Sequence, residues 1–303
     1  MKGHAKRSFL DAGLLSRLSR LMVQARYPML GSISGLHRSA TRGSSVEFAE
    51  YRKYVPGDDI KFVDWRVFAR TDRFYMKEFE ADTNLRCTLV LDVSRSMDFA
   101  WKHGSKFDLA RRMLATLAYL LVQQGDAVGL HCFSDRVVHD IPPRRSPVHL
   151  RELFDTLEKL QPRGPTDLVE RLHQLAERMK RRSLVVIFSD FFAEPEPLLD
   201  AFQHLRFFKH DVALFHLLDR QELAFEFDRP IRFADLESPA TLITDPAHIA
   251  ETYRRELERW LSEFTLGCRK FHLDYQRVLT DQDLEKTLAG FMLARMGAGS
   301  ATR

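Results

Sequence analysis

The chain is 303 residues long, with 45% hydrophobic and 29% charged residues, and this composition argues against a disordered or low-complexity protein. The formal net charge is +4, and the three cysteines lie far apart without a C-x-x-C pair, which argues against a disulfide framework and a cysteine-rich zinc site. The longest apolar run, residues 113–122, is much shorter than the roughly 20 residues of a membrane span, so we expect a soluble cytoplasmic protein.

Residues 1–30 are predicted to form a basic amphipathic helix, because leucine and methionine recur there at helical spacing. Residues 1–46 hold eight lysines or arginines against one acid, Asp11. Such a segment could meet RNA, an anionic membrane or an acidic protein surface. A solvated helix face is the simpler interpretation, because charge runs usually serve that purpose.

Residues 31–83 are predicted to form a Gly/Ser-rich loop followed by a small β-containing element. Gly and Ser occupy just over half of residues 31–45, and short mixed segments follow as far as residue 83. Asp58, Asp59 and Asp64 could form an acidic site in this region. Turn capping and ion pairs with nearby arginines explain these aspartates more simply.

Residues 84–295 alternate between strand and helix patterns, which predicts an α/β domain with a mostly parallel sheet and helices on both faces. The predicted strands are 85–93, 127–133, 136–141, 183–190, 212–218 and 271–278, and the predicted helices are 106–124, 148–160, 168–181, 196–205, 246–265 and 281–294. The tight turn at residues 134–135 predicts one antiparallel edge strand, which Pro142 and Pro143 are expected to end. Residues 296–303 are predicted to be a flexible tail.

The stretch TLVLDVSRSM, residues 88–97, places an aspartate where an apolar strand ends. Asp92 is followed at alternate positions by Ser94 and Ser96, and alternate residues of an extended segment point the same way. Three oxygens could therefore converge on one point, and oxygen ligands of this kind suit Mg²⁺, Mn²⁺ or Ca²⁺. This short pattern alone is weak evidence, because roughly one chain in ten of this length and ordinary composition contains it by chance.

Two further segments strengthen the prediction. RGPTDL, residues 163–168, places Thr166 on a loop just before a helix, and VVIFSD places Asp190 at the carboxyl end of another apolar strand. Ligands of α/β sheets gather at the carboxyl ends of strands, where the strand order reverses. If the two strands are neighbours, both aspartates and the three hydroxyl side chains would line one crevice.

This constellation resembles the metal-ion-dependent adhesion site of von Willebrand factor A domains, which have a Rossmann-like α/β fold. The residues that match its five positions are Asp92, Ser94, Ser96, Thr166 and Asp190. Pro165 replaces a glycine of the second loop, and Phe191 stands where glycine often follows the last aspartate. The resemblance implies a bound Mg²⁺, or Mn²⁺ or Ca²⁺, with a position open to a carboxylate from a partner protein.

The segments on either side of this domain are similar to the bacterial family called domain of unknown function 58. RGSSVEFAEYRKYVPGDDIKFVDWRVFAR precedes the domain, and HLLDRQELAFEFDRPIRFADLES follows the strand at residue 212. Members of that family are often encoded beside MoxR-type AAA+ ATPases, and the resemblance therefore implies such a partner. It also implies a non-enzymatic adaptor that helps to assemble or mature other proteins.

Three other interpretations stay open at this stage. The five polar residues could simply cap helices and turns. A magnesium-dependent phosphatase of the haloacid dehalogenase type also places an aspartate after its first parallel strand, although Ser94 stands where its general acid would be. A nucleic-acid-binding protein could use the basic residues 1–46, but aromatic residues do not alternate with the basic ones there.

Overall fold

A computed structural model of the chain describes residues 7–25, 47–53, 67–68, 70, 75–80, 85–227, 231–234, 236, 241–244 and 246–300. The chain forms two compact units, one of Met1–Tyr27 with Arg86–Arg303 and the other of Pro28–Leu85. The segment before residue 28 therefore belongs to the same compact unit as the large α/β region. In the smaller unit, β1 (Glu47–Lys53) pairs antiparallel with β2 (Tyr75–Glu80).

The larger unit is built on a six-stranded sheet with the order β10-β7-β6-β3-β4-β5. Its strands are β3 (Arg86–Asp92), β4 (Ala127–Phe133), β5 (Val137–Arg144), β6 (Leu184–Ser189), β7 (Asp211–Leu218) and β10 (Asp274–Leu279). Every neighbouring pair is parallel except β4 with β5, which is antiparallel. The mostly parallel sheet with one antiparallel edge strand is therefore confirmed.

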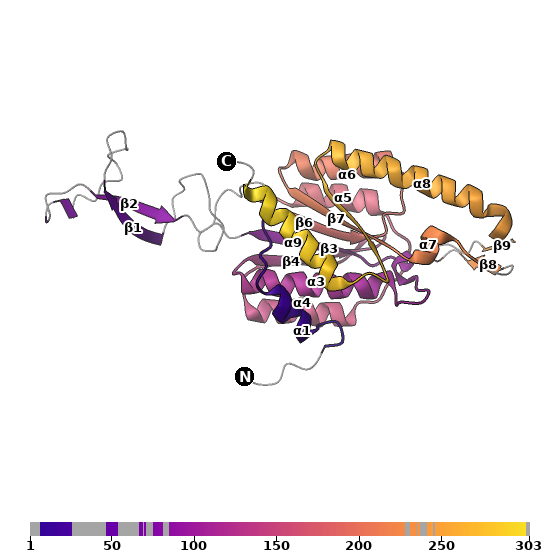
Figure 1. The fold of residues 1–303 in the computed structure, drawn as a ribbon, viewed down its shortest axis with the longest axis horizontal. Helices are drawn as coiled ribbons and strands as arrows, with labels where there is room; N and C mark the ends of the chain where they lie inside the picture. The colour runs from indigo at the N-terminus through magenta and orange to yellow at the C-terminus, as the bar shows by residue number, and fades with distance from the viewer. Residues whose placement is uncertain are drawn as a thin grey trace. The chain divides into compact units, whose positions relative to one another are not determined.

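Helices cover both faces of this sheet (Figure 1). On one face lie α5 (Leu168–Arg178), α6 (Pro195–Phe207) and α8 (Pro246–Lys270), and on the other lie α3 (Lys106–Gln123), α4 (Pro147–Lys159), α1 (Ala12–Leu18) and α9 (Leu284–Ser300). The inner strands β3, β4, β6 and β7 are almost continuously apolar and buried, as expected of parallel strands that are covered twice. None of the helices among the described residues is long and apolar enough to cross a membrane.

Strand β5 continues further than the sequence predicted. Pro142 and Pro143 were expected to end it near residue 141, yet both lie within it. A proline is tolerated here because β5 is an edge strand whose outer side needs no ladder hydrogen bond. Gly129 of β4 lets this part of β5 pack closely against β4, because a Cβ atom at residue 129 would lie 2.7 Å from the carbonyl oxygen of Ile141 and from the ring of Pro143.

The terminal helices also differ from the predicted bounds. In the described part of the amphipathic pattern, residues 9–25, the helix is only the seven-residue α1, because the backbone that follows it is bonded to other parts of the fold. Gln124 accepts a hydrogen bond from the Val23 amide at 3.2 Å and donates one to the Leu21 carbonyl at 3.0 Å. At the other end, α9 runs to Ser300, past residue 295 where the domain was expected to end.

Short elements at the carboxyl ends of the strands escaped the sequence analysis. They are the 3₁₀ turn η2 (Arg95–Asp98), the helix α7 (Arg220–Ala224), and the hairpin of β8 (Ile231–Ala234) and β9 (Thr241–Thr244). Helix α7 begins with a capping box, in which Asp219 and Glu222 satisfy each other's backbone amides. Both η2 and α7 lie beside the residues predicted to form the site.

Candidate functional site

The two aspartates of the predicted site end neighbouring strands. Asp92 is the last residue of β3, Asp190 directly follows β6, and these two strands pair in parallel. From β3 the chain passes to β4 on one side and later returns through β6 on the other, so the strand order reverses between β3 and β6. The expectation that the two strands are neighbours at the switch point is confirmed.

Asp92 is fully buried and holds the first loop in place. Its Oδ1 accepts a hydrogen bond from the Ser94 amide at 2.9 Å, and its Oδ2 accepts one from the Ser189 hydroxyl at 2.7 Å. The hydroxyl oxygens of Ser94 and Ser96 lie 3.1 Å apart. Asp92, Ser94 and Ser96 therefore form one connected cluster, in which Ser94 is buried and Ser96 is partly exposed.

The loop that carries Thr166 is bonded to the loop that follows Asp92. The Arg163 amide donates to the Val93 carbonyl at 2.8 Å, and the Arg95 amide donates to the Gly164 carbonyl at 2.9 Å. These two backbone bonds place Thr166, two residues further on, at the same end of the sheet as Ser94 and Ser96. Thr166 itself is half-buried, and its hydroxyl oxygen is shielded from solvent.

Asp190 is bonded to a buried lysine that the sequence analysis did not identify. Lys106, the first residue of α3, is fully buried, and its ammonium lies 2.8 Å from Asp190 Oδ2 and 2.7 Å from Glu222 Oε1. The ring of Phe192 covers the same ammonium, with its centroid 4.7 Å from Nζ. The other oxygen of Asp190, Oδ1, is also buried and accepts no hydrogen bond from the described residues.

Burial and charge together set the ionisation of this cluster. Burial raises the pKa of Asp92 well above its usual range, and the negative charge of Asp190 raises it further, against the hydrogen bonds from Ser94 and Ser189. Burial alone would lower the pKa of Lys106, but the carboxylates of Asp190 and Glu222 outweigh it and keep that pKa raised. The lysine is therefore charged at neutral pH.

Phe191 stands where the resembled pattern often has a glycine after the last aspartate. Its backbone adopts the left-handed conformation, with a φ of 51°, that a glycine would adopt without cost. The fully buried ring packs against Phe202 and Phe264, and the Phe191 amide donates to the Ser189 hydroxyl at 3.0 Å. Packing of the ring therefore holds the loop in a conformation that a non-glycine residue rarely adopts.

The residues present fit a divalent cation in two respects. Asp190 Oδ1 is a buried carboxylate oxygen without a hydrogen-bond donor, which is the state expected of an oxygen that can ligate a metal. In addition, Asp190 and Glu222 share one ammonium, and Asp92 is close enough for the charge of Asp190 to act on it, so the cluster has a net charge of minus two when all three carboxylates are ionised. Within the described ranges, no group of three or more His, Cys, Asp or Glu side chains forms a metal site, so hydroxyl oxygens would have to contribute.

Three residues of the cluster escaped the sequence analysis. Ser189 lies in the motif VVIFSD, where its place directly before Asp190 is the only signal, and Lys106 has the pattern of an ordinary first residue of a helix. Glu222 lies 116 residues from Lys106 in the chain, so no local pattern could have linked them. The acidic residues Asp58, Asp59 and Asp64 lie outside the described residues.

Two mycobacterial relatives are similar to nearly the whole chain. The uncharacterized proteins Rv1480 of Mycobacterium tuberculosis and Mb1516 of Mycobacterium bovis are each 27% identical to it over 300 residues. The matches cover 94% of this chain and 90% of each relative. Neither name carries a function.

Solved structures resemble the chain in fold alone. BatB from Bacteroides thetaiotaomicron, described as a conserved hypothetical protein, is 14% identical, with a TM-score of 0.47, covering 71% of this chain and 100% of that one. The VWA domain of SpRpn10 is 12% identical, with a TM-score of 0.40, covering 68% of this chain and 94% of that one. The architecture described above is an α/β fold built on one mostly parallel six-stranded sheet.

A family model provides the firmest assignment. It matches residues 50–261, which include Asp92 and Asp190 with the strands that precede them, and it covers well over half of the chain. Its description is that of a protein family of unknown function. The chain therefore belongs to the family DUF58, as the segments flanking the α/β domain predicted.

Proposed function

We propose that this protein is a non-enzymatic adaptor that binds a divalent cation and, through it, a partner protein. The observation that carries the proposal is the buried Asp190 Oδ1, which accepts no hydrogen bond from the described residues beside a second buried carboxylate, Asp92. Burying two ionised carboxylates with a single ammonium is unfavourable unless a further cation compensates them or a proton neutralises one of them. A cation at this place would relieve that cost.

Each residue of the site has a distinct role in this proposal. Asp190 and the hydroxyls of Ser94, Ser96 and Thr166 would hold Mg²⁺, Mn²⁺ or Ca²⁺, all of which prefer oxygen ligands. Asp92 fixes the loop through the Ser94 amide and the Ser189 hydroxyl, and it supplies negative charge. When bound, the ion supplies an electrophilic position that an additional oxygen ligand can complete.

The surroundings of the site favour a protein ligand with an acidic side chain. Ser96 and Thr166 are only partly buried, and Arg95 and Phe192 beside them are exposed, so the site opens to the surface. A carboxylate from a partner could approach the cation here, helped by the positive charge of Arg95. A MoxR-type AAA+ ATPase is the partner that the family resemblance suggests.

Calorimetric titration of the metal-stripped protein with Mg²⁺ and with Mn²⁺ tests the proposal. We expect saturable binding to the wild type and its loss in Asp190→Asn, because the substitution removes a charged ligand while conserving shape. Asp126→Asn is the matched control, because Asp126 is equally buried but precedes β4 at the opposite end of the sheet. Circular dichroism verifies that each variant is folded.

Equal binding to the wild type and Asp190→Asn would contradict the proposed site. Absence of binding to a folded wild type would contradict metal dependence, and the five polar residues would then serve as caps and loop bonds. If binding is lost only in Asp190→Asn, pull-down of a co-expressed MoxR-type ATPase with and without EDTA tests the adaptor role. Metal-independent capture would contradict the proposed bridge.

One observation favours the phosphatase alternative enough to test it. A phosphatase of the haloacid dehalogenase type needs a lysine near its aspartates, and Lys106 is bonded to Asp190. That lysine is fully buried and also bonded to Glu222, and both oxygens of Asp92 already accept hydrogen bonds. Hydrolysis of p-nitrophenyl phosphate with Mg²⁺, lost in Asp92→Asn, would support the enzyme over the adaptor.

A further inference from the structure

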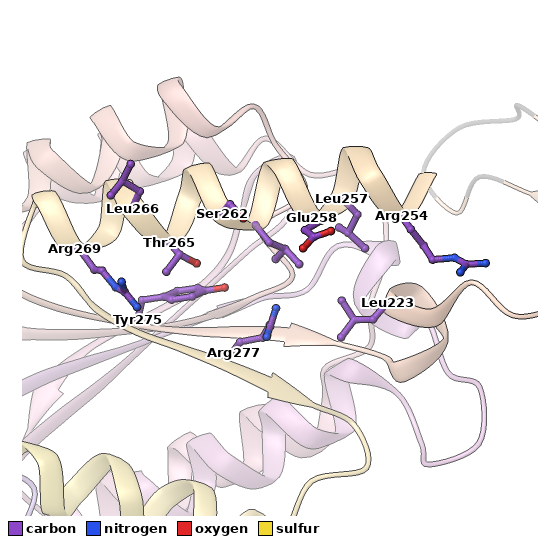
Figure 2. Close-up of a pocket in the computed structure, with 11 residues that line it drawn as sticks. Leu223, Arg254, Leu257, Glu258, Ser262, Thr265, Leu266, Arg269, Tyr275 and Arg277 are labelled. Carbon is purple, nitrogen blue, oxygen red and sulfur yellow. The ribbon is translucent and has the colours of Figure 1, made fainter. Parts of the chain in front are cut away.

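A groove separates helix α8 from the edge strand β10 (Figure 2). Its volume is about 920 Å³, which is in the range of sites that hold a small ligand or a short peptide. Residues that recur every three or four positions of α8, from Arg254 to Arg269, form one wall. Tyr275 and Arg277 of β10 point toward that helix from the floor, and Leu223 of α7 lies at one end.

The floor of the groove belongs to a strand with a free edge. Strand β10 lies at the end of the sheet and pairs with β7, and no other described strand pairs with its outer side. An edge strand presents backbone donors and acceptors that can bond to an added strand. Peptides are commonly recognised in this way, with backbone bonds giving affinity and neighbouring pockets giving specificity.

The charge of the groove indicates the chemistry of its ligand. Arg254 and Arg269 stand near its two ends and Arg277 between them, against one acid, Glu258. None of the three arginines makes an ion pair with another residue that the structure describes. A free, exposed arginine can bind a carboxylate through two parallel hydrogen bonds. The groove is therefore complementary to an acidic ligand.

Apolar side chains occupy the space between the arginines. Leu223 and Leu257 are partly exposed, and Leu266 is 69% exposed. The wall from Arg254 to Arg269 is about 22 Å long at 1.5 Å per helical residue. A strand of about seven residues has nearly the same length. In such a strand every second side chain would face the helix.

We propose that this groove binds an extended acidic segment of a partner protein, which adds as a strand to the free edge of β10. Acidic side chains at its two ends pair with the arginines, and apolar side chains at the alternate positions between them contact the leucines. The basic N-terminal region of this chain has the wrong charge to occupy the groove. This inference does not depend on the cation site.

Fluorescence anisotropy with a labelled peptide tests the inference on the full chain. The peptide is about seven residues long and has Glu, Leu, Leu and Glu at every second position, with Ser between them. We expect saturable binding in EDTA that weakens as salt is raised, because exposed ion pairs are screened. The double variant Arg269→Glu/Arg277→Glu should lower affinity by at least about tenfold, the effect of losing one charge-assisted hydrogen bond.

Two controls separate the groove from general attraction to a basic protein. Arg255→Glu changes an exposed arginine of the same helix outside the groove and should leave affinity unchanged. A peptide N-methylated at the positions that face β10 should lose binding, because it cannot donate backbone hydrogen bonds. Equal losses in Arg255→Glu and the double variant, or full binding of the methylated peptide, would overturn the proposal.

The remaining outcomes also decide the question. If the wild type does not bind the peptide, the acidic-peptide assignment is overturned. It is also overturned if sedimentation velocity shows a changed oligomeric state in the double variant, because the groove would then bind a second copy of the chain. Asp190→Asn should bind the peptide as the wild type does. Failure of the cation proposal is therefore distinguishable from failure of this one.

Discussion

Lys106 departs from the usual behaviour of its residue type. Lysine side chains are seldom fully buried, because removing an ammonium from water costs several kcal/mol. Lys106 is 0% exposed, and its charge is compensated by Asp190 and Glu222 at ordinary hydrogen-bond distances. These bonds connect helix α3, the end of β6 and helix α7, so one side chain joins three elements around the candidate site.

Removing the ammonium should destabilise the protein. Lys106→Met conserves most of the side-chain volume but leaves Asp190 and Glu222 without their cation, and breaking a buried pair in this way costs about 3–5 kcal/mol. Urea denaturation in EDTA measures the free energy of unfolding without any contribution from a metal. Lys102→Met, a change at an exposed lysine of the preceding loop, is the control and should have little effect.

A second substitution identifies the cause of that loss. Adding Glu222→Gln to Lys106→Met removes one of the two uncompensated charges, so the double variant should be more stable than Lys106→Met alone. If the double variant is the less stable of the two, the lysine acts through packing rather than through charge.

His210 should make stability depend on pH. It is 1% exposed, and its Nδ1 accepts a hydrogen bond from the Ser183 amide at 3.2 Å. Burial lowers the pKa of His210 below its ordinary value of 6.5, and the charge of Arg182 acts in the same direction. When the pH falls below 6.5, His210 is protonated in the unfolded chain but stays neutral in the folded chain. The free energy of unfolding therefore falls as pH falls.

Comparing the wild type with His210→Asn at about pH 7.5 and about pH 5.5 measures this contribution. Asparagine can keep an acceptor for the Ser183 amide but does not titrate. The free energy of unfolding of the wild type should therefore fall more between the two pH values than that of the variant. Parallel losses would mean that His210 does not contribute to acid sensitivity.

At the scale of elements, the connection between α6 and β7 contains a residue whose backbone conformation should reduce stability. Lys209 lies in the connection between α6 and β7 and is exposed, with a φ of 64°. Glycine adopts this left-handed conformation without cost, whereas a residue with a Cβ does not. Lys209→Gly should therefore stabilise the protein by about 0.5–1 kcal/mol, measured by urea denaturation.

Lys209→Ala separates the backbone effect from loss of the charge. Alanine removes the ammonium but retains the Cβ, so this variant should gain little stability. Equal stabilisation by glycine and alanine would assign the effect to the lysine side chain and contradict the backbone argument.

The main strands were predictable because burial on both faces makes them continuous apolar runs. The patterns at β3, β4, β6 and β7 gave their positions within one or two residues. Interactions between distant residues set the boundaries that were missed. Strand β5 extends through two prolines because it is an edge strand, and α1 ends early because its continuation bonds to Gln124.

The candidate site was predictable only in part, for a related reason. Asp92, Ser94 and Ser96 share one loop, so their proximity could be inferred from spacing, and the neighbouring strands then bring in Asp190. The roles of Lys106 and Glu222 depend on a contact between residues 116 positions apart. Helix α7, which carries Glu222, is only five residues long and has too few positions to show a helical period.

At the scale of the whole larger unit, a buried arginine joins the two ends of the described chain. Arg295 of α9 is 0% exposed, donates to the Gln24 carbonyl and to Asp274 at 2.7 Å each, and is also bonded to Asp211. Asp274 and Asp211 begin the strands β10 and β7. One guanidinium therefore fastens the N-terminal segment and the last helix to the edge of the sheet.

Replacing this arginine should destabilise the unit as a whole. Arg295→Met removes the buried guanidinium from Asp274 and Asp211 and its hydrogen bond to the Gln24 carbonyl, so we expect a loss of about 3–5 kcal/mol in the free energy of unfolding. Lys286→Met, at an exposed position of α9, is the control. If the two variants have the same melting temperature, Arg295 does not stabilise the contact of the N-terminal segment and α9 with the sheet.

Helix α7 places two consecutive side chains in two different environments. Glu222 bonds to Lys106 beside the candidate cation site, whereas Leu223 lines the groove under α8. Both side chains belong to one helix of five residues, so a movement of α7 as a unit would move both. Linkage then requires that if a cation changes the affinity of the groove for a peptide by some factor, the peptide changes the affinity for the cation by the same factor. Any coupling between the two binding events would therefore pass through helix α7.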